Sequence, residues 1–189
     1  NKQVGCYWYY LVSNSTTGGY TNRTLASIAP GSCTYVDIGS ICQLDVEDAH
    51  GRLKPRVSAS KSCVSDTELA VADARAAKKK LPHLKIRWML FPSSNSTLVE
   101  AVVASSHARA NLVKELKEWA SSYSDVVDGF SLDYETAPAK SGPARLRQSR
   151  GLSDFLCSLK MATGLGVTWW GGLTRMKQVV DIAAVRRCQ

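Results

Sequence analysis

Three polar residues alternate in a short apolar segment and could do acid–base chemistry. Ser131, Asp133 and Glu135 lie two residues apart in the stretch 128–135, which reads DGFSLDYE. In a β-strand such residues share one face, and the two carboxylates lie about 7 Å apart. Carboxylates this close in a partly desolvated site raise the proton affinity of one partner. A carboxyl group whose pKa is raised in this way can act as a general acid near neutral pH.

The same residues also have a simpler interpretation. Acidic side chains at the end of a strand are commonly solvated and paired with nearby arginine or lysine. Charge alone favours that interpretation, so the case for chemistry depends on the surrounding elements and on the motif as a whole.

The segments around this acidic strand alternate between strand and helix patterns. The predicted strands are residues 4–13, 34–43, 84–91, 126–134 and 165–171. The predicted helices are 69–81, preceded by capping-box spacing from Ser65 to Glu68, then 107–123 and 152–163. Residues 176–185 fit a helix, a sixth strand or both. A turn is predicted at 48–51 and a loop at 136–150.

This alternation predicts an α/β fold with a parallel sheet built from right-handed crossovers. In such folds ligands bind at the carboxyl ends of the strands. The chemistry is therefore expected just after Ser13, Gln43, Phe91, Tyr134 and Trp170.

Composition excludes several classes of protein. The chain has 189 residues, of which 44% are hydrophobic and 21% charged, which fits one ordinary domain and excludes disorder, collagen and coiled coil. No repeat or linker interrupts it, so residues 1–189 are predicted to form a single domain. The best apolar runs, 7–12 and 86–92, are much shorter than the roughly 18 residues of a membrane span, so no span is expected.

Positive charge exceeds negative charge, with 24 lysines and arginines against 16 acidic residues and a formal net charge of +8. The cations are spread over 78–80, 145–150 and 186–187, without the interleaved aromatic residues of a nucleic-acid platform. Solvated faces are favoured, and no nucleic-acid partner is expected. An acidic polysaccharide or glycoprotein would suit this charge.

Six cysteines and three glycosylation motifs predict a secreted or extracellular glycoprotein. The cysteines lack C-x-x-C spacing, which argues against a zinc site, and their even number suggests disulfides whose pairing stays open. They are Cys6, Cys33, Cys42, Cys63, Cys157 and Cys188. The N-x-[ST] motifs begin at Asn14, Asn22 and Asn95. A first residue other than Met suits a mature product whose leader has been removed.

The pattern Asp128-Gly129-x-x-x-Asp133-x-Glu135 resembles the fourth-strand motif Asp-Gly-x-Asp-x-Asp-x-Glu of the chitinase-like glycoside hydrolases, family 18. Residues 6–10 look like the family's aromatic first strand, and 84–86 like the start of its third. The resemblance implies a (β/α) barrel of the TIM type. It also implies that Glu135 protonates the glycosidic oxygen while the substrate's own N-acetyl oxygen attacks, and that Asp133 orients the acetamido group.

Three features depart from the family's pattern. Ser131 stands where the family has an inward aspartate, and residues 89–94 lack its Ser-x-Gly-Gly ending. The family's sixth-strand tyrosine and eighth-strand tryptophan have no counterpart. A closed barrel takes about 250 residues, so this one is predicted to be incomplete, with about five or six strands. A second chain, a longer parent polypeptide or a protective loop would have to cover the open edges.

Aromatic residues near strand ends are candidates for stacking on sugar rings. Trp169 and Trp170 face opposite ways, so at most one lines a site and the other packs under a helix. Trp8 is a third candidate, although core packing is the commoner role for such a residue. The three histidines lack metal-ligand spacing and no nucleotide-binding glycine loop is present, so neither a metal nor a cofactor is expected.

Two functions from different classes are consistent with these observations. The first is a secreted hydrolase that cleaves β-linked N-acetylglucosamine glycans by substrate-assisted catalysis; the presence of both Asp133 and Glu135 favours it. The second is a chitinase-like extracellular glycoprotein that binds glycans or builds an assembly without cleaving them; Ser131 and the short chain favour it. The first is slightly preferred, and the sequence leaves present activity open.

Overall fold

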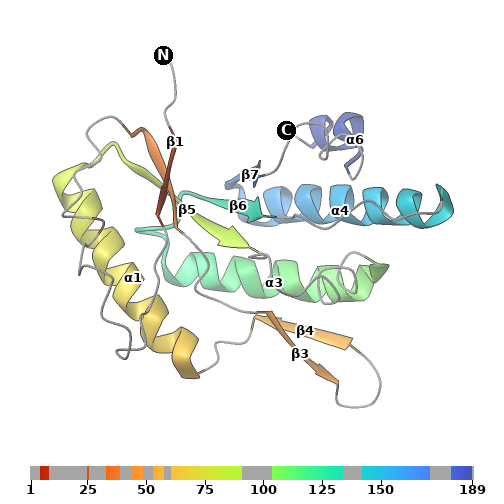
Figure 1. Cartoon of the computed structure of the whole chain (residues 1–189), viewed down its shortest axis with the longest axis horizontal. Coiled ribbons are helices and arrows are strands. Elements are labelled where there is room, and N and C mark those ends of the chain that lie inside the picture. The colour runs from red at the N-terminus through yellow and green to blue at the C-terminus, as the bar shows by residue number, and fades with distance from the viewer. Residues whose placement is uncertain are drawn as a thin grey trace, which may run out of the picture.

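The structure is a computed structural model that describes residues 5–8, 25, 33–38, 44–48, 53–57, 61–90, 104–133, 142–170 and 180–188. Its main feature is a sheet of five parallel strands with long helices around it (Figure 1). The strands are β1 (Gly5–Trp8), β2 (Tyr35–Ile38), β5 (Lys85–Leu90), β6 (Gly129–Asp133) and β7 (Gly166–Trp170). The predicted α/β fold with a parallel sheet is confirmed.

The five strands lie side by side in the order in which they occur in the chain, and every neighbouring pair is parallel. Crossovers between parallel strands are right-handed, so a sheet in chain order receives its helices on one face. A doubly wound sheet instead reverses its order and receives helices on both faces. The observed order is therefore that of a (β/α) barrel wall, and its five strands agree with the predicted incomplete barrel.

The helices are α1 (Lys61–Lys80), α3 (Ser106–Ser122), α4 (Gly142–Thr163) and the short α6 (Ile182–Arg186). Helix α3 agrees with its predicted range to one residue at each end, and the Ser105 side chain caps it by accepting a hydrogen bond from the Ala108 amide at 3.2 Å. In the part of the chain that the structure describes, no helix is both long and apolar enough to cross a membrane.

Two helices begin earlier than predicted. Helix α1 begins at Lys61, so the stretch from Ser65 to Glu68 lies inside it and the predicted capping box is wrong; such polar residues are only mildly unfavourable within a helix. Helix α4 begins at Gly142, so the predicted loop 136–150 is wrong over 142–150. Pro143 lies in the first turn of α4, where a missing N–H costs no intrahelical hydrogen bond.

A two-stranded antiparallel hairpin, β3 (Leu44–Asp48) and β4 (Leu53–Val57), interrupts the connection from β2 to α1, and β4 lies against α3. The sequence predicted only a turn and a polar loop here. The register places Asp45 opposite Arg56 and Glu47 opposite Lys54. Opposite charges at facing positions favour such a pair, and this alternation was the signal that sequence reasoning missed.

One face of the main sheet packs against the helices through aromatic residues. The Trp88 ring on β5 lies 4.9 Å from that of Trp119 on α3, and the Phe130 ring on β6 lies 6.3 Å from it. The Trp88 indole N–H donates to the Val126 carbonyl at 3.1 Å, so this buried polar group is satisfied. Since side chains alternate along a strand, Arg87 and Ser131 belong to the opposite face, which is the barrel interior.

A buried ion pair occupies the interior between β2 and β5. Asp37, which is 0% exposed, accepts hydrogen bonds from Nε and Nη2 of Arg87 at 2.8 and 2.6 Å. The guanidinium group lies 3.6 Å from the centre of the Tyr35 ring, and a Cβ on Gly5 of β1 would collide with that ring. A cation, a carboxylate and a stacked ring therefore fill a space that apolar side chains fill in most barrels.

A second charged cluster fastens the amino end of β6. Asp128 accepts hydrogen bonds from the Lys78 ammonium at 2.7 Å, the Ile86 amide at 2.8 Å and the Lys85 ammonium at 3.1 Å. Burial raises the pKa of Asp128, but these three hydrogen bonds together outweigh burial and hold its pKa below the ordinary value of 3.8. Asp128 thus ties α1 and β5 to β6 as an ionised carboxylate.

Two disulfides confirm part of the cysteine prediction. Cys6 is bonded to Cys33, joining β1 to the start of β2, and Cys157 is bonded to Cys188, joining α4 to the turn after α6. Cys63 lies in α1, and Cys42 lies outside the described residues.

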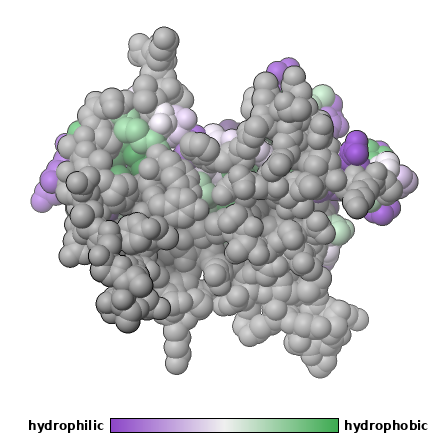
Figure 2. Space-filling view, viewed as in Figure 1, coloured by the Kyte–Doolittle hydropathy of each residue, from purple (hydrophilic) through white to green (hydrophobic). Residues whose placement is uncertain are grey.

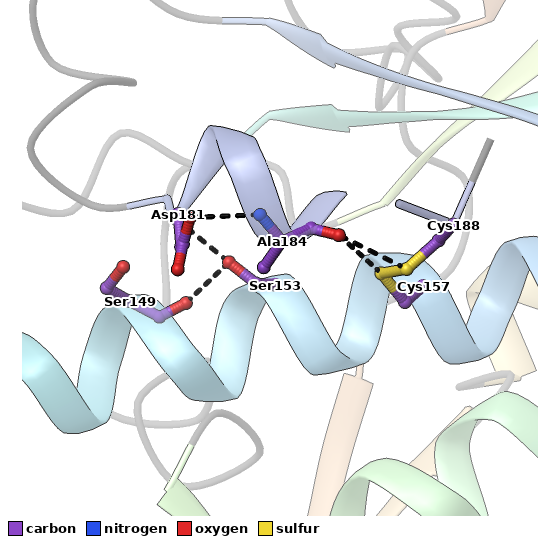
Figure 3. The surroundings of a disulfide bond; sticks show 6 residues. All are labelled: Ser149, Ser153, Cys157, Asp181, Ala184 and Cys188. Atoms are coloured by element: carbon purple, nitrogen blue, oxygen red, sulfur yellow. Dashed lines mark hydrogen bonds between the residues drawn. A yellow bond between two sulfur atoms is a disulfide. The ribbon is translucent and has the colours of Figure 1, made fainter. Parts of the chain in front are cut away.

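Hydrogen bonds next to the Cys157–Cys188 bond hold α6 on α4 (Figure 3). The Asp181 amide donates to the Ser153 hydroxyl at 3.0 Å, and that hydroxyl donates to the Ser149 carbonyl at 2.8 Å. The Asp181 side chain accepts from the Ala184 amide at 2.9 Å and so caps α6. Residues 182–185 of the segment 176–185, predicted as helix, strand or both, are therefore helical, while 176–179 lie outside the described residues.

Asp128→Asn should lower the free energy of unfolding by about 1–3 kcal/mol at pH 7, because an amide cannot replace the charged hydrogen bonds from two lysines. The folded pKa of Asp128 lies below 3.8, so its stabilising contribution is complete well above that pH and is lost as the pH falls through the folded pKa. Urea unfolding at a series of pH values should show the variant and the wild type converging in acid. Asp125→Asn is the control, because its ion pair with Arg75 is half exposed and should contribute little. Equal effects of the two substitutions would contradict this role of Asp128.

Arg87→Met should cost about 3–5 kcal/mol of unfolding free energy, since it leaves the Asp37 carboxylate buried without its cation. The double variant Asp37→Leu with Arg87→Met should recover part of this loss, because neither charge then remains inside the barrel. Denaturant unfolding of the single and double variants measures both effects. A single variant as stable as the wild type would show that the pair does not matter to the interior.

Candidate functional site

The carboxyl ends of the five parallel strands form one edge of the half-barrel. The last residues of the strands are Trp8, Ile38, Leu90, Asp133 and Trp170. Loops that follow such ends carry the active sites of (β/α) barrels. The acidic motif therefore approaches the edge at which the sequence predicted chemistry, because Asp133 ends β6.

Ser131 is completely buried on the interior face of β6. Its neighbours in the register are Met89 on β5 and Thr168 on β7. Its hydroxyl has no hydrogen-bond partner among the residues that the structure describes. A buried hydroxyl without a partner costs about 1–3 kcal/mol, so the interior beside Ser131 favours a polar group that could bond to it.

Asp133 continues this interior set of positions to the end of β6. Asp133 is two residues beyond Ser131 and belongs to the same alternating set, which is consistent with the shared face predicted for them. Glu135 lies outside the described residues, so its position relative to Asp133 stays a prediction.

The strand register separates the three candidate tryptophans. Trp170 is paired with Asp133, so it belongs to the interior set of positions. Trp169 is paired with Leu132 and packs against the hydrophobic core on the helix side. Trp8 is paired with Ile38, a buried core residue, so it also belongs to the helix-facing set. Of the three, only Trp170 occupies an interior position in the register, next to Asp133.

The first two residues of the motif have structural roles at the other end of β6. Asp128 is the carboxylate that binds Lys78 and Lys85, so it is not available as a proton donor to a substrate. Gly129 allows β7 to approach, because a Cβ there would lie 2.6 Å from the Gly166 carbonyl oxygen and 3.3 Å from Cγ of Arg87. The motif thus combines strand packing at its start with candidate chemistry at its end.

Sequence reasoning missed the interior cluster of Tyr35, Asp37 and Arg87. The signal was present, because Asp37 is the one charged residue of the predicted strand 34–43, and Arg87 is a residue of opposite charge in the mostly apolar strand 84–91. Once those strands are taken as parallel neighbours, the charges fall on one face and can pair. The cluster fixes β2 to β5 inside the half-barrel.

The other predicted sites fall partly outside the described residues. Asn14, Asn22 and Asn95 all lie outside them, so glycosylation stays a prediction. Among the residues that are described, no group of three or more histidine, cysteine, aspartate or glutamate side chains could hold a metal ion.

The exposed cations of the described residues are spread over several elements, including Lys114 and Lys117 on α3 and Arg186 and Arg187 at the end of α6. Lys79 and Lys80 are exposed at the end of α1, and Arg145, Arg147 and Arg150 are exposed in the first turns of α4. Figure 2 shows hydrophilic residues at opposite sides of the molecule, where these two helix ends lie in Figure 1. This arrangement is the one expected of solvated helix ends.

No protein-family model and no curated protein matches the chain, but solved structures do. The Group IV chitinase of Ostrinia furnacalis matches with a TM-score of 0.70 and 17% identity, covering 98% of this chain and 49% of that one. YKL-39, solved in the presence of chitooligosaccharides, matches with a TM-score of 0.69 and 15% identity, covering 98% and 48%. The chitinase-like agglutinin of Robinia pseudoacacia matches with 0.60 and 16%, covering 87% and 45%.

The chain spans about half the length of the solved chains that it matches. At these identities the likeness establishes the fold, and it agrees with the five parallel strands in chain order. The expected resemblance to the chitinase-like glycoside hydrolases of family 18 is therefore confirmed in the fold: the chain has the structure of one half of a chitinase-like (β/α) barrel.

Proposed function

We propose that this chain is part of a secreted chitinase-like hydrolase that cleaves β-linked N-acetylglucosamine glycans. The observation that carries the proposal is the interior face of β6, where Ser131 and Asp133 lead toward the carboxyl edge of a chitinase-like half-barrel. Glu135 follows Asp133 by two residues in the sequence. Ionised Asp128, by contrast, is held in the lysine cluster at the opposite end of the strand. That division leaves Asp133 and Glu135 as the acidic pair for chemistry.

In the proposed reaction, Glu135 acts as the general acid and gives its proton to the glycosidic oxygen as the bond to the anomeric carbon breaks. The carbonyl oxygen of the substrate's own N-acetyl group forms a new bond to that carbon, which gives a cyclic intermediate. Asp133 orients the acetamido group and stabilises the positive charge on it. Glu135 then takes a proton from a water molecule as that water bonds to the anomeric carbon. The bond from this carbon to the N-acetyl oxygen breaks, and the acetamido group is restored. Neither a metal nor a cofactor takes part.

Trp170 is the best-placed candidate for stacking on a sugar ring, because its register position adjoins Asp133. Trp8 and Trp169 occupy helix-facing positions, and we leave them out of the proposed binding surface.

A non-catalytic glycan-binding or structural role is the second candidate. Ser131 supports it, since the serine cannot supply the charge of the family's inward aspartate to its neighbour Asp133. The matching structures include a protein described as an agglutinin and another solved with chitooligosaccharides. In this alternative, the interior face and Trp170 would bind the glycan without cleaving it.

The two disulfides and the three N-x-[ST] motifs support an extracellular location for either function. Residues 1–189 are proposed to belong to one domain, with no nucleic-acid partner.

Glu135→Gln should abolish release of the fluorophore from a fluorogenic N-acetylglucosamine oligomer, because the amide cannot donate the required proton; a loss of 100-fold or more is expected. The assay should run from mildly acidic to neutral pH. Glu118→Gln, on the exposed side of α3, is the matched control and should keep full activity. Turnover retained in Glu135→Gln would refute the assignment. Binding of the oligomer without turnover by the wild type would favour the glycan-binding role.

The edges of β1 and β7 require further strands in this proposal. Each of these strands has one neighbour among the described strands, and an uncovered edge attracts other chains. An eight-stranded barrel needs three strands beyond these five. A second copy of this chain would bring five strands, which is two more than the barrel can take. A longer parent polypeptide or a different chain fits this number.

The deglycosylated protein from its natural source should therefore be larger than 20.6 kDa as a single chain, or should form a complex with a second polypeptide. Mass spectrometry of the denatured protein and light scattering of the native one separate these two cases. A folded, active monomer of 20.6 kDa would contradict the need for further strands.

A further inference from the structure

The two cysteines outside the described disulfides flank the β3–β4 hairpin. Cys42 lies two residues before β3, and Cys63 is the third residue of α1, six residues after β4. The other four cysteines are already bonded to one another. Within one chain, Cys42 and Cys63 therefore have only each other as a partner.

The hairpin register brings the chain near these two cysteines together. Leu44 and Val57 are paired Cα partners, so the chain enters and leaves the hairpin at the same end. Two residues of chain reach at most about 7 Å and six reach at most about 20 Å. A disulfide needs a Cα–Cα distance of roughly 4.4–6.8 Å, which lies within this reach.

We propose that Cys42 and Cys63 form a third disulfide, which closes the base of the β3–β4 hairpin. Its formation joins the two sulfur atoms and releases both thiol protons. The two electrons pass by thiol–disulfide exchange to an oxidising disulfide, which is reduced to two thiols. The same class of oxidant would have formed the other two bonds. The sequence separation of 21 residues is similar to their separations of 27 and 31.

The bond would fix the hairpin in the connection after β2. That connection starts at the carboxyl edge of the sheet, and β4 lies against α3, so a fixed base limits how the hairpin can turn relative to both. Closing this loop also removes conformations from the unfolded chain. The proposed bond does not depend on the proposed function.

Peptide mapping of the non-reduced protein tests the proposal directly. Free thiols are first blocked with N-ethylmaleimide in denaturant, and the chain is then cut after lysine and arginine and before aspartate. These cuts place Cys33 in fragment 24–36, Cys42 in 37–44 and Cys63 in 62–65. The linkage of fragment 154–160 to 188–189 through Cys157 and Cys188 is the internal control.

The expected result is a species that contains fragments 37–44 and 62–65 and that separates into the two on reduction. Maleimide on both cysteines would overturn the proposal. So would a link from either fragment to any other fragment, or to the same fragment of a second chain. Each result is independent of whether the protein cleaves a glycan.

A double variant, Cys42→Ser with Cys63→Ser, gives a second test in the folded protein. The backbone amides of β3 and β4 should exchange with deuterated solvent faster than in the wild type, while those of β6 should keep their rate. Cys42→Ser alone should leave one thiol that reacts with maleimide. Unchanged exchange in the hairpin of the double variant would contradict a bond at its base.

Discussion

Every strand of the main sheet is only four to six residues long, and its side chains must fit the helix layer on one face and the barrel interior on the other. The rest of the structure depends on this constraint. One set of alternate side chains packs under helices, where Trp88 and Phe130 gather around Trp119. The other set faces the barrel interior, where Arg87 pairs with Asp37 and Ser131 is buried. A shift of one residue in any strand would exchange these sets. The register therefore decides which polar groups can take part in chemistry.

Charges in the described half-barrel are divided along the strand direction. At the amino end of β6, Asp128 joins three elements, and between β2 and β5 Asp37 and Arg87 neutralise each other. These carboxylates stabilise the scaffold because they accept short hydrogen bonds from cationic side chains. Asp133, by contrast, ends β6 at the carboxyl edge. A scaffold that is held by its own ion pairs can leave a different set of acids free to change their protonation.

Local periodicity in the sequence was enough to predict most of the strands and helices. The parallel strands and the ends of α3 were recovered because apolar runs and an apolar stripe record the burial of one face. The start of α4 was missed because Pro143 and Gly142 indicate a loop unless their place in a first helical turn is known. The hairpin was missed because its strands are short and charged. The motif and the alternation of side chains along a strand were enough to place Ser131 and Asp133 on one face. The Asp37–Arg87 pair could not be predicted in this way, because that requires knowing which strands are neighbours.

The close contact between Gly129 and the Gly166 carbonyl has an effect at the far end of the same two strands. Strands β6 and β7 are held together by a parallel ladder that runs from this contact to Asp133 and Trp170. A larger residue at position 129 would push against the Gly166 carbonyl and disturb the first rung of this ladder. The pairing of the acidic residue with the tryptophan therefore depends on a glycine at the opposite end of the strand.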